Sequence, residues 1–346
     1  MRIGTLEISS QSRPKIIAEI GINHGGSLEV AKKLAELAVE NGADIVKTQV
    51  HIPSEEMSPQ AENIIPSHCD KSIFKIVEEC SLPIDKEFQL KEFIESLGSQ
   101  YLATPFSAKA AHLLGRDFQL NAFKIGSGEC NNIYLLGAVA SYGKPVIIST
   151  GMNSLTSCRQ THTLMTKKYG LDVVMMHTTN LYPTPFELVR LGGIQELQQI
   201  AGHNAIGLSD HTTDNLACLG AVALGAVVLE RHFTDSKERE GPDILNSMTP
   251  YELKELRKSS EQMFLMRGGS KEHEIPEEQG TRDFAFATIV ATQAINKGDL
   301  ISIENTAPKR PSLGHFSPRD YESILGKKAA VSIDEGVHLL RKHVCL

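Results

Sequence analysis

The stretch KIIAEIGINHGGSLEVAKKLAELAVENGADIVKTQV, residues 15–50, decides the fold of this chain. It opens with a short apolar run, residues 16–20, which is typical of a buried strand. Ser27 is a good helix N-cap, and the apolar residues after it follow the period of a helix until Gly42, where a glycine can end it. A second strand-like run covers residues 44–49. The stretch is therefore predicted to form a strand, a helix and a second strand.

The same alternation continues to residue 233. Strand-like runs lie at residues 16–20, 44–49, 101–105, 122–126, 145–150, 173–178, 205–209 and 227–232. Each run is followed by a helical pattern, and the last helix is expected at residues 250–267. Eight successive strand–helix units predict an α/β fold, the closed (β/α)8 TIM barrel. A doubly wound open sheet is the alternative, and the count of eight argues against it.

Two segments depart from the repeat. Residues 50–84 are too long for a simple strand-to-helix loop, so we expect an insertion at the C-terminal face of the barrel, where lids and substrate loops lie. Residues 268–282 are polar, glycine-rich and charged, which is typical of a linker. The predicted domains are thus a barrel (1–267), this linker, and a small domain (283–346). The small domain should have strands at 287–292 and 338–344 and turns at 296–299 and 334–337.

Composition excludes several classes of protein. The chain has 346 residues, 41% hydrophobic and 22% charged, which is ordinary for a soluble globular protein, and its core must be aliphatic because Trp is absent. A net charge of −7 does not indicate a nucleic-acid-binding surface. No apolar run is long enough to span a membrane, the first residues lack a signal-peptide core, and the six cysteines form no CxxC pair. The protein is predicted to be cytoplasmic, with neither nucleic acid nor membrane as a partner.

Polar side chains occur near the C-terminal end of almost every predicted strand, the end that carries the active site in TIM barrels. They are Glu19, Lys47, Gln49, Thr104, Lys124, Ser127, Glu129, Ser149, Asn180, Tyr182, Ser209, His211, Glu230 and His232. An unpaired polar group in a barrel interior costs roughly 2–7 kcal/mol. A single Ser or Thr is often only a hydrogen-bonded strand end. Such residues on eight strands together predict a catalytic site.

The types of these residues indicate two chemistries. His211 and His232, on adjacent strands, predict a divalent metal site completed by water and substrate oxygens, although a lone histidine is more often a hydrogen-bonded core residue. Lys47 and Lys124 with nearby hydroxyl and amide groups suit an anion that carries both phosphate and carboxylate. A Schiff base on one of these lysines is the alternative. The chain has neither GxxxxGK[ST] nor GxGxxG, so nucleotide binding lacks support.

Nine motifs together resemble bacterial N-acetylneuraminate (sialic acid) synthases. They are EIGINHGG, KTQVHI, ATPFS, FKIGSGECNN, STGMNS, HTTNLYPTP, IGLSDHT, GAVALGAVVLERHFT and GPDI. The tail, with DFAFATIVA, NKGDLI, KRP and LGKKA, resembles the antifreeze-like (SAF) domain that ends this family. The resemblance covers essentially the whole chain in the same order, and the combination is far more specific than any one motif.

The resemblance implies a transferase that condenses phosphoenolpyruvate with N-acetylmannosamine and water, and releases N-acetylneuraminate and phosphate by C–O cleavage. It implies a divalent metal, Mn²⁺ first, with Mg²⁺ or Co²⁺ as alternatives. Relatives that make legionaminic or pseudaminic acid from a 2,4-diacetamido-2,4,6-trideoxyhexose are the alternative function. A non-catalytic carbohydrate-binding protein would not need both lysines and both histidines.

The resemblance also assigns roles by position. His211 and His232 would bind the metal, while Glu19 and Glu230 would lie at the reacting centre. Phosphoenolpyruvate would be held by Lys47, Thr104, Lys124, Ser127, Ser149, Asn180 and Ser209, and the sugar by Gln49, Glu129, Tyr182, Asp243 and Arg310. The SAF domain would reach the partner's active site in a domain-swapped homodimer. Thr48 replaces a histidine found in close relatives, and the strand alternation predicts that it faces the helices.

Overall fold

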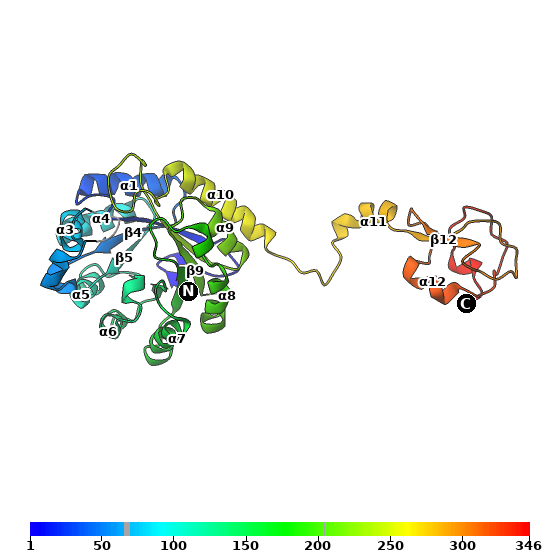
Figure 1. Ribbon diagram of the computed structural model, residues 1–346, viewed down its shortest axis with the longest axis horizontal. Helices are drawn as coiled ribbons and strands as arrows, with labels where there is room; N and C mark the ends of the chain where they lie inside the picture. The colour runs from blue at the N-terminus through cyan, green and yellow to red at the C-terminus, as the bar shows by residue number, and fades with distance from the viewer. Residues whose placement is uncertain (66–69, 204) are drawn as a thin grey trace. The chain divides into compact units, whose positions relative to one another are not determined.

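The protein is described by a computed structural model that covers residues 1–65, 70–203 and 205–346. Its contacts divide the chain into two compact units, Met1–Gly268 and Gly269–Leu346. Figure 1 shows the strands of the first unit enclosed by helices, and the short elements of the second.

Within the described residues, eight strands form one parallel sheet in the first unit. They are β3 (Lys15–Gly21), β4 (Ile45–Val50), β5 (Gln100–Pro105), β6 (Phe123–Ile125), β7 (Val146–Ser149), β8 (Val173–Thr178), β9 (Ile206–Asp210) and β10 (Val228–His232). Their spatial order is β5-β4-β3-β10-β9-β8-β7-β6. The outermost strands, β5 and β6, also lie next to each other, so the sheet curls round into a barrel. The predicted TIM barrel is confirmed, and the open sheet is wrong.

Each strand is followed by a helix that packs on the outside of the barrel (Figure 1). These helices are α1 (Leu28–Glu40), α4 (Ile84–Ser96), α5 (Ala108–Arg116), α6 (Ile133–Ala140), α7 (Leu155–Thr163), α8 (Gly192–Ala201), α9 (Leu216–Ala223) and α10 (Pro250–Met266). The predicted caps form: the Ser27 hydroxyl accepts the Val30 N–H, and Gly42 follows α1 with φ of 103°. Thr249 and Glu252 form a capping box that starts α10.

The N-terminal end of the barrel is closed by a hairpin that the sequence did not predict. Its strands, β1 (Arg2–Ile3) and β2 (Leu6–Glu7), are two residues each, too short to show a pattern. The side chains of Ile3 and Ile8 are buried against Ile17 and other residues of the barrel interior. One end of the barrel is therefore filled by apolar side chains, which leaves the C-terminal end for chemistry.

The predicted insertion begins where β4 ends, at the C-terminal face of the barrel. It contains α2 (Pro53–Glu56), the 3₁₀ turn η1 (Pro59–Asn63) and α3 (Ile73–Cys80). Residues 66–69 of the insertion, including Cys69, lie outside the described part. The five cysteines that the structure describes are free thiols.

The second unit has short elements around a small apolar core. They are η5 (Pro276–Glu278), α11 (Gln279–Ala285), β11 (Thr288–Ala291), β12 (Thr306–Lys309), η6 (Pro318–Asp320), α12 (Tyr321–Ile324) and η7 (Arg341–His343). Gly298 and Gly336, with φ of 92° and 82°, make the two predicted turns. The second half of the predicted linker is helical, because η5 and α11 lie there.

The strand predicted at residues 338–344 is wrong. His338 and Val344 each make a single bridge, to Val290 and Ala329 respectively, and η7 lies between them. Leu339 and Val344 of this segment are buried, but the chain reaches the core through separate bridges. Apolar spacing alone does not distinguish these two arrangements.

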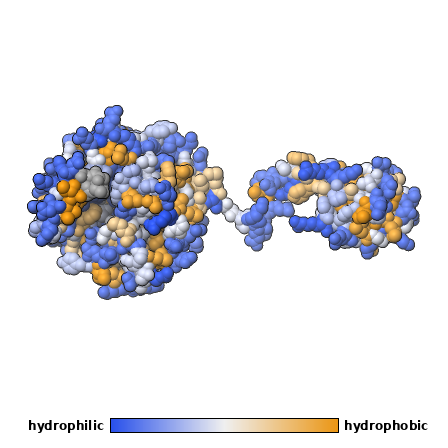
Figure 2. Space-filling model, in the orientation of Figure 1, coloured by the Kyte–Doolittle hydropathy of each residue, from blue (hydrophilic) through white to orange (hydrophobic). Residues whose placement is uncertain are grey.

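None of the helices in the described ranges is long and apolar enough to cross a bilayer. Figure 2 shows mostly hydrophilic residues on the visible face, with hydrophobic residues scattered among them, and scattered apolar residues are normal on protein surfaces.

Candidate active site

A cavity of about 140 Å³ lies at the C-terminal end of the barrel strands. Its lining includes twelve of the residues predicted for the site: Lys47, Gln49, Thr104, Lys124, Ser127, Ser149, Asn180, Tyr182, Ser209, His211, Glu230 and His232. Residues two apart on a strand face the same side. For this reason the pairs on β4, on β10 and at the end of β9 all reach one space.

Four buried charged side chains alternate in sign at the bottom of this cavity. Lys47 Nζ contacts the Glu19 carboxylate, and it lies 3.6 Å from Glu230 Oε1. Lys124 Nζ lies 3.5 Å from the same Glu230 oxygen and donates to Ser149 Oγ at 2.6 Å. Buried charges are tolerated when each has a partner of opposite sign, so the four groups stabilise one another.

The two carboxylates of this cluster differ in charge state. Burial raises the pKa of Glu19 to about 7, against the attraction of Lys47. Burial would also raise the pKa of Glu230, but Lys124 and Lys47 outweigh it and lower that pKa to about 2. At neutral pH Glu230 is ionised, while Glu19 can hold or release a proton. Two carboxyl groups with separated pKa values are a common arrangement for acid–base chemistry.

His211 and His232 face each other across the cavity mouth, with their ring centroids 5.5 Å apart. His211 Nδ1 is 2.8 Å from the Thr179 carbonyl oxygen, to which it must donate, so its Nε2 carries the lone pair. His232 Nδ1 lies 3.4 Å from Asp243 Oδ2. Burial, followed by charge from His232, lowers the pKa of His211 to about 4. Burial, followed by charge from Lys47, lowers the pKa of His232 to about 3. Both imidazoles are neutral at physiological pH and can act as ligands.

A metal ion fits these donors only in part. His232 Nδ1 is buried and makes no hydrogen bond among the described residues, and the Asp243 carboxylate lies 3.4 Å from it. However, in the described chain no group of three or more His, Cys, Asp or Glu side chains could hold a metal. Two imidazoles would therefore provide only part of the coordination shell, and water or substrate oxygens would complete it.

A buried ion pair lies behind the two histidines. Arg231 Nε is 3.3 Å from Asp210 Oδ2, and the Arg231 guanidinium also donates to the Thr212 carbonyl oxygen at 2.7 Å. These residues alternate with the site residues on β9 and β10 and so point toward the helices. The pair holds the two histidine-bearing strands together from outside the barrel.

Thr48 faces the helices, as the alternation predicted. Its hydroxyl is 2.5 Å from Glu87 Oε1 of α4 and 2.9 Å from the Tyr101 hydroxyl. The residue is fully buried and has no part in the cavity lining. The prediction that Thr48 lies outside the site is confirmed.

The remaining predicted residues lie at different places. Glu129 accepts a hydrogen bond from Asn132 Nδ2 at 2.5 Å and is not among the lining residues that the structure describes. Asp243 contacts the lining residue His232, with its Oδ2 3.4 Å from His232 Nδ1. Arg310 is exposed at the end of β12 in the second unit, and the structure does not place that unit relative to the barrel.

Four residues that line the cavity were not predicted from the sequence: Phe106, Gly126, Gly128 and Thr178. Phe106 and Thr178 lie at strand ends inside the motifs ATPFS and HTTNLYPTP, which was the available signal. Gly151, in the STGMNS motif, is also required, because a Cβ there would lie 1.7 Å from Asn180 Oδ1.

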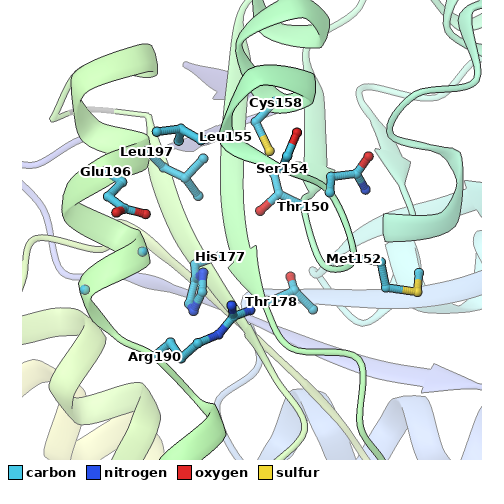
Figure 3. A pocket seen from close by; sticks show the side chains of 13 residues that line it. Thr150, Met152, Ser154, Leu155, Cys158, His177, Thr178, Arg190, Glu196 and Leu197 are labelled. Carbon is cyan, nitrogen blue, oxygen red and sulfur yellow. The ribbon is translucent and has the colours of Figure 1, made fainter.

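A larger cavity, of about 750 Å³, lies beside the first, at the ends of β7 and β8 and the starts of α7 and α8. Figure 3 shows its lining, which includes His177, Arg190 and Glu196. In the described chain it shares Thr178 with the smaller cavity but none of the residues predicted for substrate or metal. The paired charges make the smaller cavity the candidate active site, despite the difference in size.

Comparison with known proteins identifies the family of the chain. Residues 34–272 match the NeuB family and residues 286–344 match the SAF domain. The chain is 35% identical over 326 residues to N,N'-diacetyllegionaminic acid synthase of Campylobacter jejuni, covering 92% of this chain and 97% of the relative. It is 30% identical to human N-acetylneuraminate-9-phosphate synthase, covering 92% and 89%.

A solved structure is also similar to this chain. The sialic acid synthetase of Leptospira borgpetersenii, in complex with citrate, superposes with a TM-score of 0.74 at 28% identity, covering 81% of this chain and 94% of that one. The family match covers most of the barrel, and the alignments cover most of the length of the two relatives. The chain therefore belongs to the NeuB family of synthases and ends in a SAF domain.

Proposed function

We propose that this enzyme condenses phosphoenolpyruvate with the open-chain aldehyde of an acetamido sugar, and that it forms a nine-carbon sugar acid and phosphate. The observation that supports this most is the buried array of Lys47, Lys124, Glu19 and Glu230 next to two neutral histidines. The lysines suit an anion with phosphate and carboxylate groups. The hydroxyl groups of Thr104, Ser149 and Ser209 are the nearby donors.

The chain's own residues supply most of the chemistry. When bound at His211 and His232, a divalent cation (Mn²⁺, or Mg²⁺ or Co²⁺) supplies Lewis-acid polarisation of the sugar carbonyl. Carbon 3 of phosphoenolpyruvate forms a bond to the aldehyde carbon, whose oxygen takes up a proton. Carbon 2 becomes cationic, and the ionised Glu230 stabilises it. Water adds to carbon 2 while Glu19 accepts its proton. Cleavage of the carbon–oxygen bond then releases phosphate and leaves a ketone.

Two acceptor sugars are candidates. The motifs GSGECNN and NLYPTP favour N-acetylmannosamine, which would make the enzyme an N-acetylneuraminate synthase. The 35% identity to a legionaminic acid synthase favours a 2,4-diacetamido-2,4,6-trideoxyhexose instead.

Phosphate release from phosphoenolpyruvate should be measured with both sugars, with and without Mn²⁺. With ¹⁸O bridging carbon 2 and phosphorus, we expect the label in phosphate. Label kept in the sugar acid, or no phosphate with any sugar, would contradict the proposal.

We expect phosphoenolpyruvate binding to weaken in alkaline solution. Burial, partly offset by Glu230, lowers the pKa of Lys124 to about 8. The ammonium is therefore charged below about pH 8 and loses its charge above it. Since the charged form binds the anion, kcat/KM for phosphoenolpyruvate should fall about tenfold per pH unit above 8. At saturating phosphoenolpyruvate, the decline in rate should begin at a higher pH than the decline in kcat/KM. The reason is that the bound anion favours the charged lysine. A flat kcat/KM profile up to pH 10 would contradict this assignment.

We also propose that the SAF domain serves its partner's active site in a homodimer, through Arg310. The part of the linker before η5, residues 268–275, can extend by about 3.3 Å per residue and so can span roughly 25 Å toward a second barrel. Glu19→Ala should inactivate the barrel, and Arg310→Ala should weaken sugar binding only. Mixed dimers made by refolding the two variants together should regain kcat/KM that neither parent has. As a control, the same mixture is made with Lys309→Ala, which removes the neighbouring cation, instead of Arg310→Ala. Mixed dimers that form but stay at parental activity would show that Arg310 does not act across the interface.

A further inference from the structure

A buried network joins the insertion after β4 to the active-site cavity. His51 Nδ1 is 2.8 Å from Glu56 Oε1, and His51 Nε2 is 3.1 Å from Gln49 Oε1. The side chains of His51 and Glu56 are each only 6% exposed. The His51 ring also stacks on Phe106, with ring centroids 4.2 Å apart and planes at 17°. Gln49 and Phe106 both line the cavity, so the network ends at the cavity wall.

The hydrogen bonds determine where the protons lie. The Gln49 amide oxygen and an ionised Glu56 oxygen can only accept, so with Glu56 ionised both ring nitrogens of His51 donate. His51 is then an imidazolium paired with the Glu56 carboxylate, and the pair has no net charge. Because the Gln49 oxygen is occupied by His51, the Gln49 NH₂ group is left for the cavity.

The other side of the Gln49 amide agrees with this orientation. A Cβ built on Gly21 would lie 3.2 Å from Gln49 Nε2 and 2.8 Å from Glu19 Oε1, so the NH₂ group and the carboxylate both lie close to Gly21. An NH₂ donor is favoured next to a carboxylate, whereas an amide oxygen would be repelled. If the Gln49 amide were rotated by 180°, its oxygen would face Glu19. Its NH₂ group would then face His51 Nε2, which would need a lone pair to accept the hydrogen bond.

We propose that His51 and Glu56 are positioning residues that hold Gln49 as a hydrogen-bond donor, so that it selects sugars presenting an acceptor oxygen, such as an acetamido carbonyl or a hydroxyl. This inference rests on the proposed function, because it assumes that Gln49 contacts the sugar. It gives the insertion a defined role: α2 carries Glu56 to the site, while the neighbouring Glu55 bonds Lys109 at 2.9 Å and ties α2 to α5.

The same geometry makes the orientation depend on protonation of the pair. If His51 keeps only its Nδ1 proton, Nε2 becomes an acceptor and the Gln49 amide turns over. Among the described residues, His24, after β3, and Glu87 of α4 are two further titratable side chains that act electrostatically with His51. Glu56 Oε2 is buried and, within the described residues, has no hydrogen-bond partner, so Glu56 depends on His51 for compensation of its charge.

Steady-state kinetics test the proposal. His51→Phe keeps a ring to stack on Phe106 but removes both hydrogen bonds. We expect its KM for the sugar to rise about 10-fold, the usual effect of losing one buried hydrogen bond, while its KM for phosphoenolpyruvate stays within twofold of wild type. Glu56→Gln keeps the volume at the other end and should show the same split. His51→Gln offers an amide donor to Gln49 and should recover most of the affinity for sugar.

The matched control is Thr48→Val, on the same strand but facing the helices. It should lower thermal stability without separating the two KM values. The inference is overturned if His51→Phe leaves the sugar KM unchanged, or if both KM values rise together as they would after general damage to β4.

A second measurement does not depend on turnover. In protein labelled with ¹⁵N-histidine, the His51 signals are identified by their absence in His51→Phe. A proton on Nε2 at neutral pH is the expected result, and its loss in Glu56→Gln would show that the carboxylate maintains it. An unprotonated Nε2 in the wild-type protein would overturn the proposal. If instead the wild-type enzyme releases no phosphate with any sugar, the proposed function fails, while this measurement still tests the network.

Discussion

Replacing Lys47 by Met is expected to lower kcat/KM about 1,000-fold, the upper range for removing one group that stabilises charge in a reaction. The anion loses one of its two cations. Glu19 and Glu230 also lose the ammonium that separates them, since Lys47 contacts Glu19 and lies 3.6 Å from Glu230. Breaking a buried ion pair from one side costs about 3–5 kcal/mol, so the melting temperature should fall as well. The measurements are steady-state kinetics and calorimetry.

Two further variants separate catalysis from folding. Lys47→Met with Glu19→Gln removes the unpaired carboxylate, so stability should recover while activity stays low. Lys15→Met is the matched control, because Lys15 is also buried on a barrel strand but at the N-terminal end of β3. Its kcat/KM should equal that of wild type. If Lys47→Met retained more than a tenth of wild-type activity, the assignment of Lys47 to the anion would be wrong.

Exhaustive chelation is the second treatment for which we expect a very large effect. Turnover should fall by a factor of about 100 to 1,000, as for other sites that stabilise developing negative charge, and Mn²⁺, Co²⁺ or Mg²⁺ should restore it. His232→Ala should be equally inactive, and added metal should not rescue it. His177→Gln alters a buried histidine that lines only the larger cavity, and it should respond to metal as wild type does.

Full activity after chelation would remove the metal from the proposal. It would support the Schiff-base alternative, in which a neutral lysine attacks a substrate carbonyl. Lys124 is the better candidate of the two lysines, because burial lowers its pKa to about 8, whereas the pKa of Lys47 is raised. Borohydride trapping of a substrate adduct on either lysine would then decide between the mechanisms.

Local sequence determined the barrel and the direction of its side chains. Residues 15–50 already carried the strand–helix–strand period, and repetition of that unit implied closure. Strand alternation correctly placed Lys47 and Gln49 on one side of β4 and Thr48 on the other. These properties depend on the backbone of one strand or helix, so a single segment is enough to predict them.

Only the tertiary structure decided which groups meet and how they are charged. The contact of Glu19 with Lys47 and the lone pair on His211 Nε2 depend on residues far apart in sequence. So does the division of labour between the carboxylates: two residues of almost the same chemistry have pKa values of about 7 and about 2. Their different environments come from burial and from neighbouring lysines, which only the closed barrel brings together. The bridges at residues 338–344 were missed for the same reason, because they join residues far apart in the chain. The N-terminal hairpin is local, and it was missed because its strands are only two residues each.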